Sequence, residues 1–287
     1  MVLLIKEKIN KTPPFILTSS HSGTKFPKNF FENKLINVDK KTLLMVSDLF
    51  VDELIENIKP FNLIKLISEY SRAYIDLNRN IQEIDKKRIK SFKLNHNFNV
   101  SGYTRNGYGL IHTKTYDQRD IYKNLLSFHD VEKRIIKIYK PWHQTLQKKI
   151  EELKNYNDQV LIIDFHSMPS EIFNHNQFKR ADIVLGDQYG TSSSPEFTNI
   201  LKTLFEEHGF SVVKNVPYKG GYISKNYGIP SKGVHAIQIE IRRDLYMDEK
   251  KLSKKNEFNN FKNRLEIVIE NYIKNFIGEV ELEFAAQ

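Results

Sequence analysis

The stretch VLIIDFHSMPS, residues 160–170, predicts a strand at the centre of a sheet and then changes character. Its first four residues form a continuous apolar run, which is typical of a strand buried on both faces. Asp164, His166 and Ser167 follow at once, and such groups are costly to bury without partners. The stretch therefore indicates a buried strand whose end carries functional polar side chains.

The segments around this strand alternate between strand and helix patterns. Strand patterns occupy 13–23, one or two stretches within 62–80, 181–187, 211–216 and 234–246. Helical patterns occupy 39–60, 117–155 with a break near Pro141 left open, 194–210 and 258–278. Strands separated by helices predict an α/β layered fold with a largely parallel or mixed sheet, in one domain over 1–287.

Two long segments predict loops. Residues 81–115 have no clear period, and a loop of this length inside a compact domain is more often functional than idle. Residues 218–233, YKGGYISKNYGIPSKG, are rich in glycine. Gly220 and Gly221 allow either plain turns or a close approach of the backbone to a ligand.

Composition and charge narrow the class of protein. The chain has no cysteine, so a metal site must use His, Asp and Glu side chains. The N-terminal apolar run is too short for a signal peptide, and no window has the length of a spanning helix, so we expect a soluble cytoplasmic protein without a membrane partner. The net charge of +9 comes from lysines mixed with acids, which favours steering of a small anionic substrate over nucleic-acid binding.

Two histidines stand at strand ends that share one rim if the strands run parallel. His21 follows the strand at 13–23, and His166 ends the strand quoted above. Such a pair suits a zinc ion, with a carboxylate or a third imidazole completing the set. Asp48 interrupts the apolar pattern of the predicted helix 39–60 and is a candidate third ligand, with a helix-surface acid as the alternative. Asp164 shares a strand face with His166 and either orients that imidazole or binds the metal itself.

Other polar side chains suit the chemistry of such a site. Glu240 lies in the middle of an alternating strand, where it would act as a general base beside a metal, unless the strand is an edge strand with a solvated face. Arg72 and Arg79 look like receptors for anions, with surface salt bridges as the alternative. His143 follows a proline and an aromatic residue, and it either supports the site or belongs to the core.

Several of these motifs together resemble the N-formylglutamate amidohydrolase family, over roughly residues 13–250. The motifs are SSHSGTKFP, SRAYIDLNRN, KPWHQTL, IIDFHSMPS, ADIVLGD and KGGYISKNYGIPSKGVHAIQIEIRRDLYMDE, in that family's order. The resemblance implies a three-layer αβα fold with a mixed, largely parallel sheet, as in the metallocarboxypeptidase-like superfamily. That superfamily usually has Glu three residues after its first His ligand. Here that position is Thr24, so Asp48 becomes the better candidate.

The resemblance also implies roles for the remaining residues. His166 would be the distant zinc ligand, and Glu240 would be the base that activates water. Asn78 and Arg79 resemble a carboxylate receptor with Arg72 nearby, and Gly221 would lie against the substrate.

The implied reaction is the zinc-dependent hydrolysis of N-formyl-L-glutamate to formate and L-glutamate, as in histidine breakdown. A different divalent metal, a different N-acyl amino acid, or an inert anion-binding relative are the alternatives.

Overall fold

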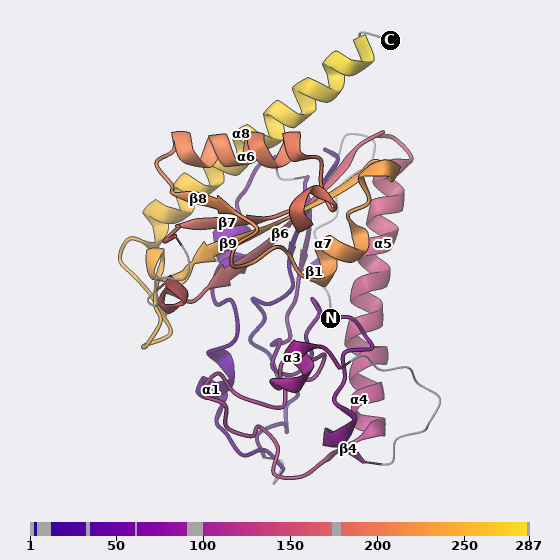
Figure 1. Cartoon of the computed structure of the whole chain (residues 1–287), viewed down its shortest axis with the longest axis vertical. Coiled ribbons are helices and arrows are strands. Elements are labelled where there is room, and N and C mark those ends of the chain that lie inside the picture. The colour runs from indigo at the N-terminus through magenta and orange to yellow at the C-terminus, as the bar shows by residue number, and fades with distance from the viewer. Residues whose placement is uncertain are drawn as a thin grey trace. The chain divides into compact units, whose positions relative to one another are not determined.

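The computed structural model describes residues 3–4, 13–32, 35–60, 62–90, 100–173 and 179–285 (Figure 1). The N-terminal feature at 1–10 lies almost wholly outside these residues, as do residues 91–99 of the predicted loop 81–115. The chain groups into two compact units. The first comprises Met1–Leu3, Ser20–Leu49 and Ile67–Leu146, and the second comprises Leu4–Ser19, Phe50–Leu66 and Gln147–Gln287. The single domain expected from the sequence stays a prediction.

The second unit carries most of a seven-stranded sheet in the order β1-β3-β2-β6-β9-β7-β8. These strands are β1 (Leu3–Leu4), β2 (Phe15–Ser19), β3 (Ile64–Ile67), β6 (Val160–Met168), β7 (Ile183–Gly186), β8 (Val212–Lys214) and β9 (Val234–Arg242). The pairs β2–β6, β6–β9 and β7–β8 are parallel, whereas β7 runs antiparallel to β9. The predicted mixed, largely parallel sheet is therefore confirmed.

Strands β6 and β9 lie at the centre of the sheet by the strand order, and both faces of each strand are covered. All nine residues of each strand are buried, as the apolar run in β6 predicts. Their parallel register pairs Asp164 with Gln238 and His166 with Glu240. Paired residues point to the same face, so four polar side chains lie together there.

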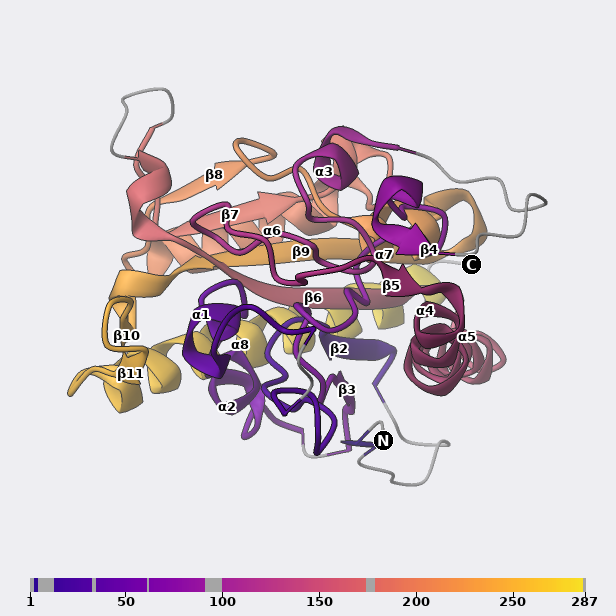
Figure 2. The same cartoon turned by 90° about the horizontal axis from the view of Figure 1, so that it is seen from below.

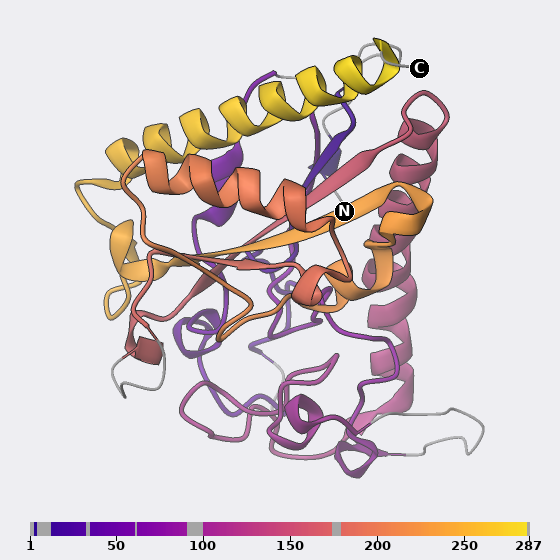
Figure 3. The ribbon, with the colours of Figure 1, turned by 45° about the horizontal axis from the view of Figure 1, so that its top comes forward.

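Helices α6 (Pro195–Glu207) and α8 (Phe258–Ala285) lie side by side along the sheet in Figures 1 and 3. Figure 2, from below, shows β6, β7 and β9 in front of both helices. Aromatic rings join these layers: Phe276 of α8 lies 4.9 Å from Phe15 of β2 and 4.8 Å from Phe197 of α6, between ring centroids. Such pairs add about 0.5–1.5 kcal/mol beyond their buried area. The sheet is therefore flanked by helices, as predicted.

A buried histidine in β9 makes stability depend on pH. His235 Nδ1 accepts a hydrogen bond from the Ser194 backbone N–H (3.0 Å), and Nε2 pairs with Gln159 Oε1 (2.8 Å), which requires a neutral ring. Burial, with a smaller contribution from Lys154, lowers the pKa of His235 from 6.5 to about 4.

The unfolded chain therefore binds this proton more readily than the folded chain. Stability should be full above about pH 6.5 and fall toward pH 4, by up to about 3 kcal/mol from this group. Urea titrations across this range should show a steeper loss for the wild type than for His235→Asn, which keeps an acceptor but cannot titrate. Parallel curves for the two proteins would contradict this assignment.

The other helices and short strands correct two predictions made from the sequence. They are α1 (Lys40–Leu44), α2 (Val51–Ile55), β4 (Ile89–Lys90), α3 (Gly102–Arg105), β5 (Leu126–Ser127), α4 (Phe128–Arg134), α5 (Lys140–Lys154), α7 (Tyr222–Tyr227), β10 (Met247–Asp248) and β11 (Ser253–Lys254). The predicted helix 117–155 begins only at Phe128. Residues 135–139 form a π-helical turn just before Pro141, whose ring cannot fit a regular preceding turn. The glycine-rich loop 218–233 contains the short helix α7, which packs against β9 and β6.

Of the one or two strands predicted within 62–80, one forms, and residues 71–80 are not a strand. Side chains bond the local backbone there instead: Ser71 Oγ accepts from the N–H of Ala73 (3.2 Å), and Asp76 Oδ1 accepts from the N–H of Asn78 (2.9 Å). Such bonds compete with a strand ladder and favour turns. Only β3 therefore forms within 62–80. Among the described residues, no helix combines the length and apolar character needed to cross a membrane.

Candidate metal centre

His21 and Asp48 approach each other within the first unit. Both are buried, with 3% and 1% of their surfaces exposed. His21 Nδ1 lies 3.6 Å from Asp48 Oδ2, which is longer than an ordinary hydrogen bond. The backbone N–H of Asp48 donates to the carbonyl oxygen of His21 (3.0 Å), so the two chain segments are fixed together.

Asp48 lies outside any helix, which corrects the predicted continuous helix 39–60. Helix α1 ends at Leu44, and α2 begins at Val51 after Phe50, whose φ of 67° is left-handed. In a regular helix the Asp48 N–H would donate to the carbonyl oxygen four residues earlier, whereas here it donates to the carbonyl oxygen of His21. The break turns the Asp48 carboxylate toward the imidazole, so the helix-surface alternative is wrong.

His166 is held by Asp164 on the same face of β6. Its Nε2 lies 2.8 Å from Asp164 Oδ2, and Asp164 Oδ1 accepts a hydrogen bond from Thr18 Oγ1 of β2 (2.7 Å). All three residues are buried. This arrangement favours the orienting role expected for Asp164, because its two oxygens already serve Thr18 and His166.

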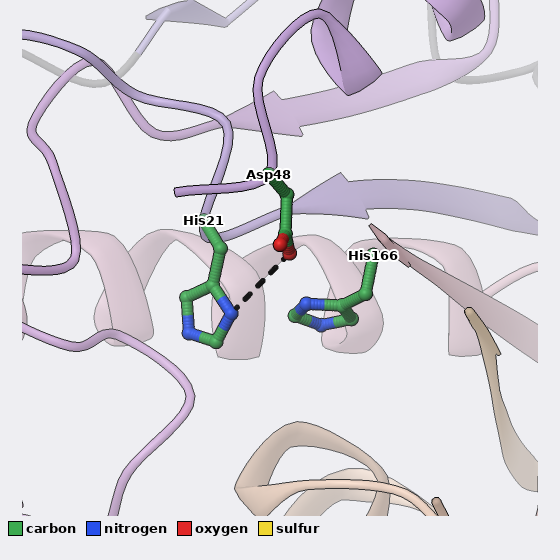
Figure 4. A group of neighbouring side chains, drawn as sticks. All are labelled: His21, Asp48 and His166. Atoms are coloured by element: carbon green, nitrogen blue, oxygen red, sulfur yellow. Dashed lines mark ion pairs between the residues drawn. The ribbon is translucent and has the colours of Figure 1, made fainter. Parts of the chain in front are cut away.

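His21, Asp48 and His166 form the one group that the described residues offer with metal-binding spacing. One ligand atom from each lies within 4.8 Å of the other two, and Figure 4 shows their side chains pointing toward one another. Ligand atoms around a tetrahedral zinc ion, with bonds of about 2.0–2.2 Å, are about 3.3–3.5 Å apart. Two imidazoles and a carboxylate at this spacing fit a catalytic zinc site, which has three protein ligands and an open position.

A second carboxylate orients His21. Asp76 Oδ1 lies 2.6 Å from His21 Nε2, which matches the contact between Asp164 and His166 Nε2. An imidazole that donates a hydrogen bond from its Nε2–H to a carboxylate presents the Nδ1 lone pair to a cation. The supporting carboxylates thus prepare both histidines for the same task. Asp76 lies within the motif SRAYIDLNRN, and the sequence alone assigned it no such contact.

Asp76 is also the centre of a buried charge network. Its Oδ2 accepts from Arg72 Nη2 (2.8 Å) and lies 3.2 Å from His112 Nε2 and 3.9 Å from Arg79 Nε. Burial acts to raise the pKa of Asp76, but Arg72, His21 and Arg79 outweigh it and hold that pKa well below its usual range. Burial also lowers the pKa of His112 to about 4, so this imidazole is neutral. His112 falls in the long loop 81–115, where no pattern singled it out.

The candidate anion receptors Arg72 and Arg79 flank Asp76. Arg79 Nε donates to the carbonyl oxygen of Tyr108 (3.0 Å), and its guanidinium lies 4.2 Å from the centroid of the Tyr103 ring. The arginine side chains are only 17% and 13% exposed, so the surface salt-bridge alternative does not describe them. Asn78 is buried beside them.

Glu240 lies on a central strand, which corrects the edge-strand alternative. Strand β9 has β6 on one side and β7 on the other, and Glu240 is 7% exposed. Gln238 Nε2 donates to Glu240 Oε1 (2.7 Å), while Gln238 Oε1 accepts from the N–H of Gly221 (2.7 Å). Gln238, which the sequence reading did not select, thus links the Gly221 turn to Glu240.

Two further residues of the sequence reading lie close to these groups. Gly221 follows Gly220, whose φ of +111° requires glycine, and it is the residue that precedes helix α7. His143 packs on α5 against the rings of Tyr139 and Trp142, 4.1 and 4.9 Å away between centroids. Burial lowers the pKa of His143 to about 4, opposed by a bond with the Leu77 backbone. His143 is therefore half-buried against these rings and supports the chain next to Asn78.

Replacing Asp164 with Asn should weaken the binding of a divalent metal at the candidate site without unfolding the chain. Asn keeps one oxygen for Thr18 but presents an NH2 group to His166. The side chain at position 164 then no longer fixes the imidazole tautomer that a metal ligand requires. Loss of such a carboxylate typically costs about 10- to 100-fold in metal affinity. Competition with a chromogenic chelator measures this, and Asp158→Asn at an exposed site is the control. Equal affinities for both variants would show that His166 does not depend on Asp164.

Comparisons with known proteins agree with the sequence resemblance. The family described as N-formylglutamate amidohydrolase matches residues 13–247. N-formylglutamate deformylase of Pseudomonas putida is 27% identical over 239 residues, which cover 82% of each chain. The crystal structure of N-formylglutamate amidohydrolase from Ralstonia eutropha JMP134 is 28% identical with a TM-score of 0.87, covering 96% of this chain and 97% of that one. The structure of gene product Atu2144 from Agrobacterium tumefaciens shares the fold at 17% identity and a TM-score of 0.67, covering 98% of this chain and 96% of that one.

Proposed function

We propose that this chain converts N-formyl-L-glutamate to formate and L-glutamate. The premise is that the chain belongs to the N-formylglutamate amidohydrolase family and is a hydrolase of amide bonds. The observation that carries the proposal is the buried group of His21, Asp48 and His166, since hydrolysis of an unactivated amide calls for an electrophile and an activated water. The cytoplasmic location and a part in histidine breakdown stay predictions.

The metal of this proposal is Zn²⁺, held by His21, Asp48 and His166. Other divalent ions share such donor sets, so the donors alone do not choose among them. When bound, the ion acidifies water and polarises the carbonyl group of the substrate. Asp76 orients the imidazole of His21, and Asp164 orients that of His166. Both carboxylates are buried away from competing solvent.

Glu240 is the proposed general base. It takes a proton from the attacking water as the new C–O bond forms, and it returns that proton to the amine nitrogen as the C–N bond breaks. Three observations support this role: the carboxylate is buried, it lies beside His166 in register, and Gln238 Nε2 donates a hydrogen bond to its Oε1. The products are then formate and L-glutamate, whose amino group is free.

Arg72, Asn78 and Arg79 are the proposed holders of the two substrate carboxylates. N-formylglutamate is a dianion, and guanidinium groups bind carboxylates with two parallel hydrogen bonds. The arginines flank Asp76 in the chain and contact its carboxylate, which also orients the proposed metal ligand His21. Gly221 was expected at the substrate as well. Its N–H serves Gln238, so a direct contact between Gly221 and the substrate stays a prediction.

Arg79→Met should raise KM for N-formyl-L-glutamate and leave kcat within a few-fold. Hydrogen bonds to charged groups contribute about 1.5–3 kcal/mol, so KM should rise about 10- to 100-fold. The variant should also discriminate less between N-formyl-L-glutamate and N-formyl-L-glutamine. Steady-state kinetics with Arg119→Met, whose side chain is 55% exposed, provide the control. A loss confined to kcat would place Arg79 elsewhere in the mechanism.

A substrate panel tests the proposed specificity. N-formyl-L-glutamate should have the highest kcat/KM among N-formyl-L-aspartate, N-acetyl-L-glutamate and N-formyl-L-methionine, with formate or acetate release as the readout. A higher kcat/KM for another N-acyl amino acid would keep the amidohydrolase and replace the substrate.

A further inference from the structure

A cavity of about 800 Å³ lies within the first unit and is separate from the proposed catalytic residues. Its lining residues include Phe30, Tyr70, Tyr74, Tyr122, Leu126 and Ile138, together with Lys90. None of the residues proposed above to bind metal or substrate lines it. The volume is in the range of cavities that take small molecules, about 300–1,000 Å³.

The walls of this cavity are aromatic and aliphatic. Tyr74 lies edge-on to Phe30, with centroids 5.4 Å apart, and is stacked with Tyr70 at 5.9 Å. Leu126 and Ile138 add aliphatic surface to the lining. Edge and offset contacts of this kind are the geometries that aromatic rings prefer, so a flat ring suits this space.

Arg134 supplies a buried cation at the wall. Its side chain is 3% exposed and lies 4.1 Å from the centroid of Tyr74. Nη1 donates to the carbonyl oxygen of Tyr74 (2.9 Å), and Nη2 donates to Asp130 (2.5 Å). Nε is buried, and no acceptor for it exists within the described part of the chain. Arg134, a residue of the cavity lining, therefore carries one N–H without a partner among the described residues.

The charged residues of the lining favour an anion. Lys90, Lys133 and Lys137 join Arg134, and Asp130 is the one acid among the lining residues described. The three lysines are exposed, so they form a cationic rim around an apolar interior. Although burial acts to lower it, contacts with Tyr122, Asp130 and Tyr74 raise the pKa of Arg134, so its charge is permanent.

We propose that this cavity is a second ligand site that takes a small aromatic carboxylate. The ring lies against Phe30, Tyr74 and Leu126, and the carboxylate faces Arg134 and the lysine rim. N-formylglutamate lacks an aromatic or extended apolar part, so the two sites take different ligands. They share one stretch of chain, since Tyr74 precedes Asp76 by two residues and Asp76 contacts His21.

The test uses 2-naphthoate and its neutral analogue naphthalene-2-carboxamide, titrated into the full-length protein by calorimetry. The probe has few atoms, so we expect a Kd of about 0.1–1 mM. The amide has nearly the same shape without the charge and should bind about 10-fold more weakly. Saturating N-formyl-L-glutamate should leave 2-naphthoate binding unchanged, whether or not that compound is the substrate.

Three variants locate the bound probe. Lys133→Glu with Lys137→Glu reverses the rim charge at exposed positions and should weaken binding about 5- to 10-fold. Leu125→Trp fills the cavity from a lining position that is 40% exposed and should abolish binding without a change in charge. Lys140→Glu, on the same helical stretch but outside the lining, is the matched control and should bind like the wild type.

Several outcomes would overturn the proposal. These are no binding of 2-naphthoate at about ten times the expected Kd, equal affinity for the amide, equal affinity in the Leu125→Trp protein, or displacement by N-formyl-L-glutamate. The last result would place the probe in the substrate site. None of these readouts depends on turnover, so a failure here is distinct from a failure of the proposed hydrolysis.

Discussion

Glu240→Gln should lower kcat for N-formyl-L-glutamate by about 1,000-fold, within the range of about 100- to 10,000-fold that general acid–base catalysis contributes. Gln keeps the size of Glu, and its amide oxygen accepts from Gln238 Nε2 as the carboxylate does. It cannot take a proton from water at neutral pH. The variant should therefore retain the fold, the bound metal and a similar KM.

Stopped assays of formate release, metal analysis and a thermal melt together test this prediction. Glu206→Gln, on the outer side of α6 where Glu206 pairs with Lys202, is the matched control and should keep wild-type turnover. A Glu240→Gln protein that binds zinc and turns over at the full rate would remove Glu240 from the role of base.

His166→Ala should abolish both stoichiometric zinc binding and turnover. Three protein ligands are the norm for catalytic zinc, and the loss of one leaves two donors, His21 and Asp48. We expect zinc affinity to fall by more than about 100-fold and kcat/KM by at least about 1,000-fold. Asp164 stays bonded to Thr18, so the buried carboxylate retains one partner and the fold persists.

Inductively coupled plasma measurements after gel filtration report the zinc content, and circular dichroism reports the fold. His129→Ala, at an exposed position of α4, is the control for histidine removal and should keep its zinc and its activity. A folded His166→Ala protein with one zinc per chain would contradict the ligand assignment.

The centre of the sheet is predictable from sequence because its strands have simple patterns. The apolar run of β6 identifies a buried strand, and the alternation of β9 identifies a strand but left an edge position open; the structure buries both strands and pairs them in register. The polar residues of those strands, Asp164, His166 and Glu240, then fall on one face by the period of two. Family resemblance adds the order of the motifs.

Asp48 shows where periodicity is misleading. Apolar residues at helical spacing run through 39–60, yet the chain leaves the helix between Leu44 and Val51. A long-range hydrogen bond from the Asp48 N–H to His21, together with left-handed Phe50, overrides the local preference. No local window contains the partner that decides this geometry, so the break was not predictable.

Asp76 and His112 were missed for a related reason. Their roles come from a network of residues far apart in sequence, in which Asp76 contacts His21 and His112. A sequence shows which groups are able to pair but not which are neighbours. An acid between apolar residues inside a motif rich in Arg and Asn, such as Asp76 in SRAYIDLNRN, is the sequence signal of such a network.

Formate release from N-formyl-L-glutamate, measured with zinc-equilibrated protein and with protein stripped by a chelator, tests whether the hydrolysis depends on a bound metal. We expect turnover in the first sample, its loss in the second, and its return when zinc is added back. Undiminished turnover by protein shown to be free of metal would contradict the role assigned to His21, Asp48 and His166.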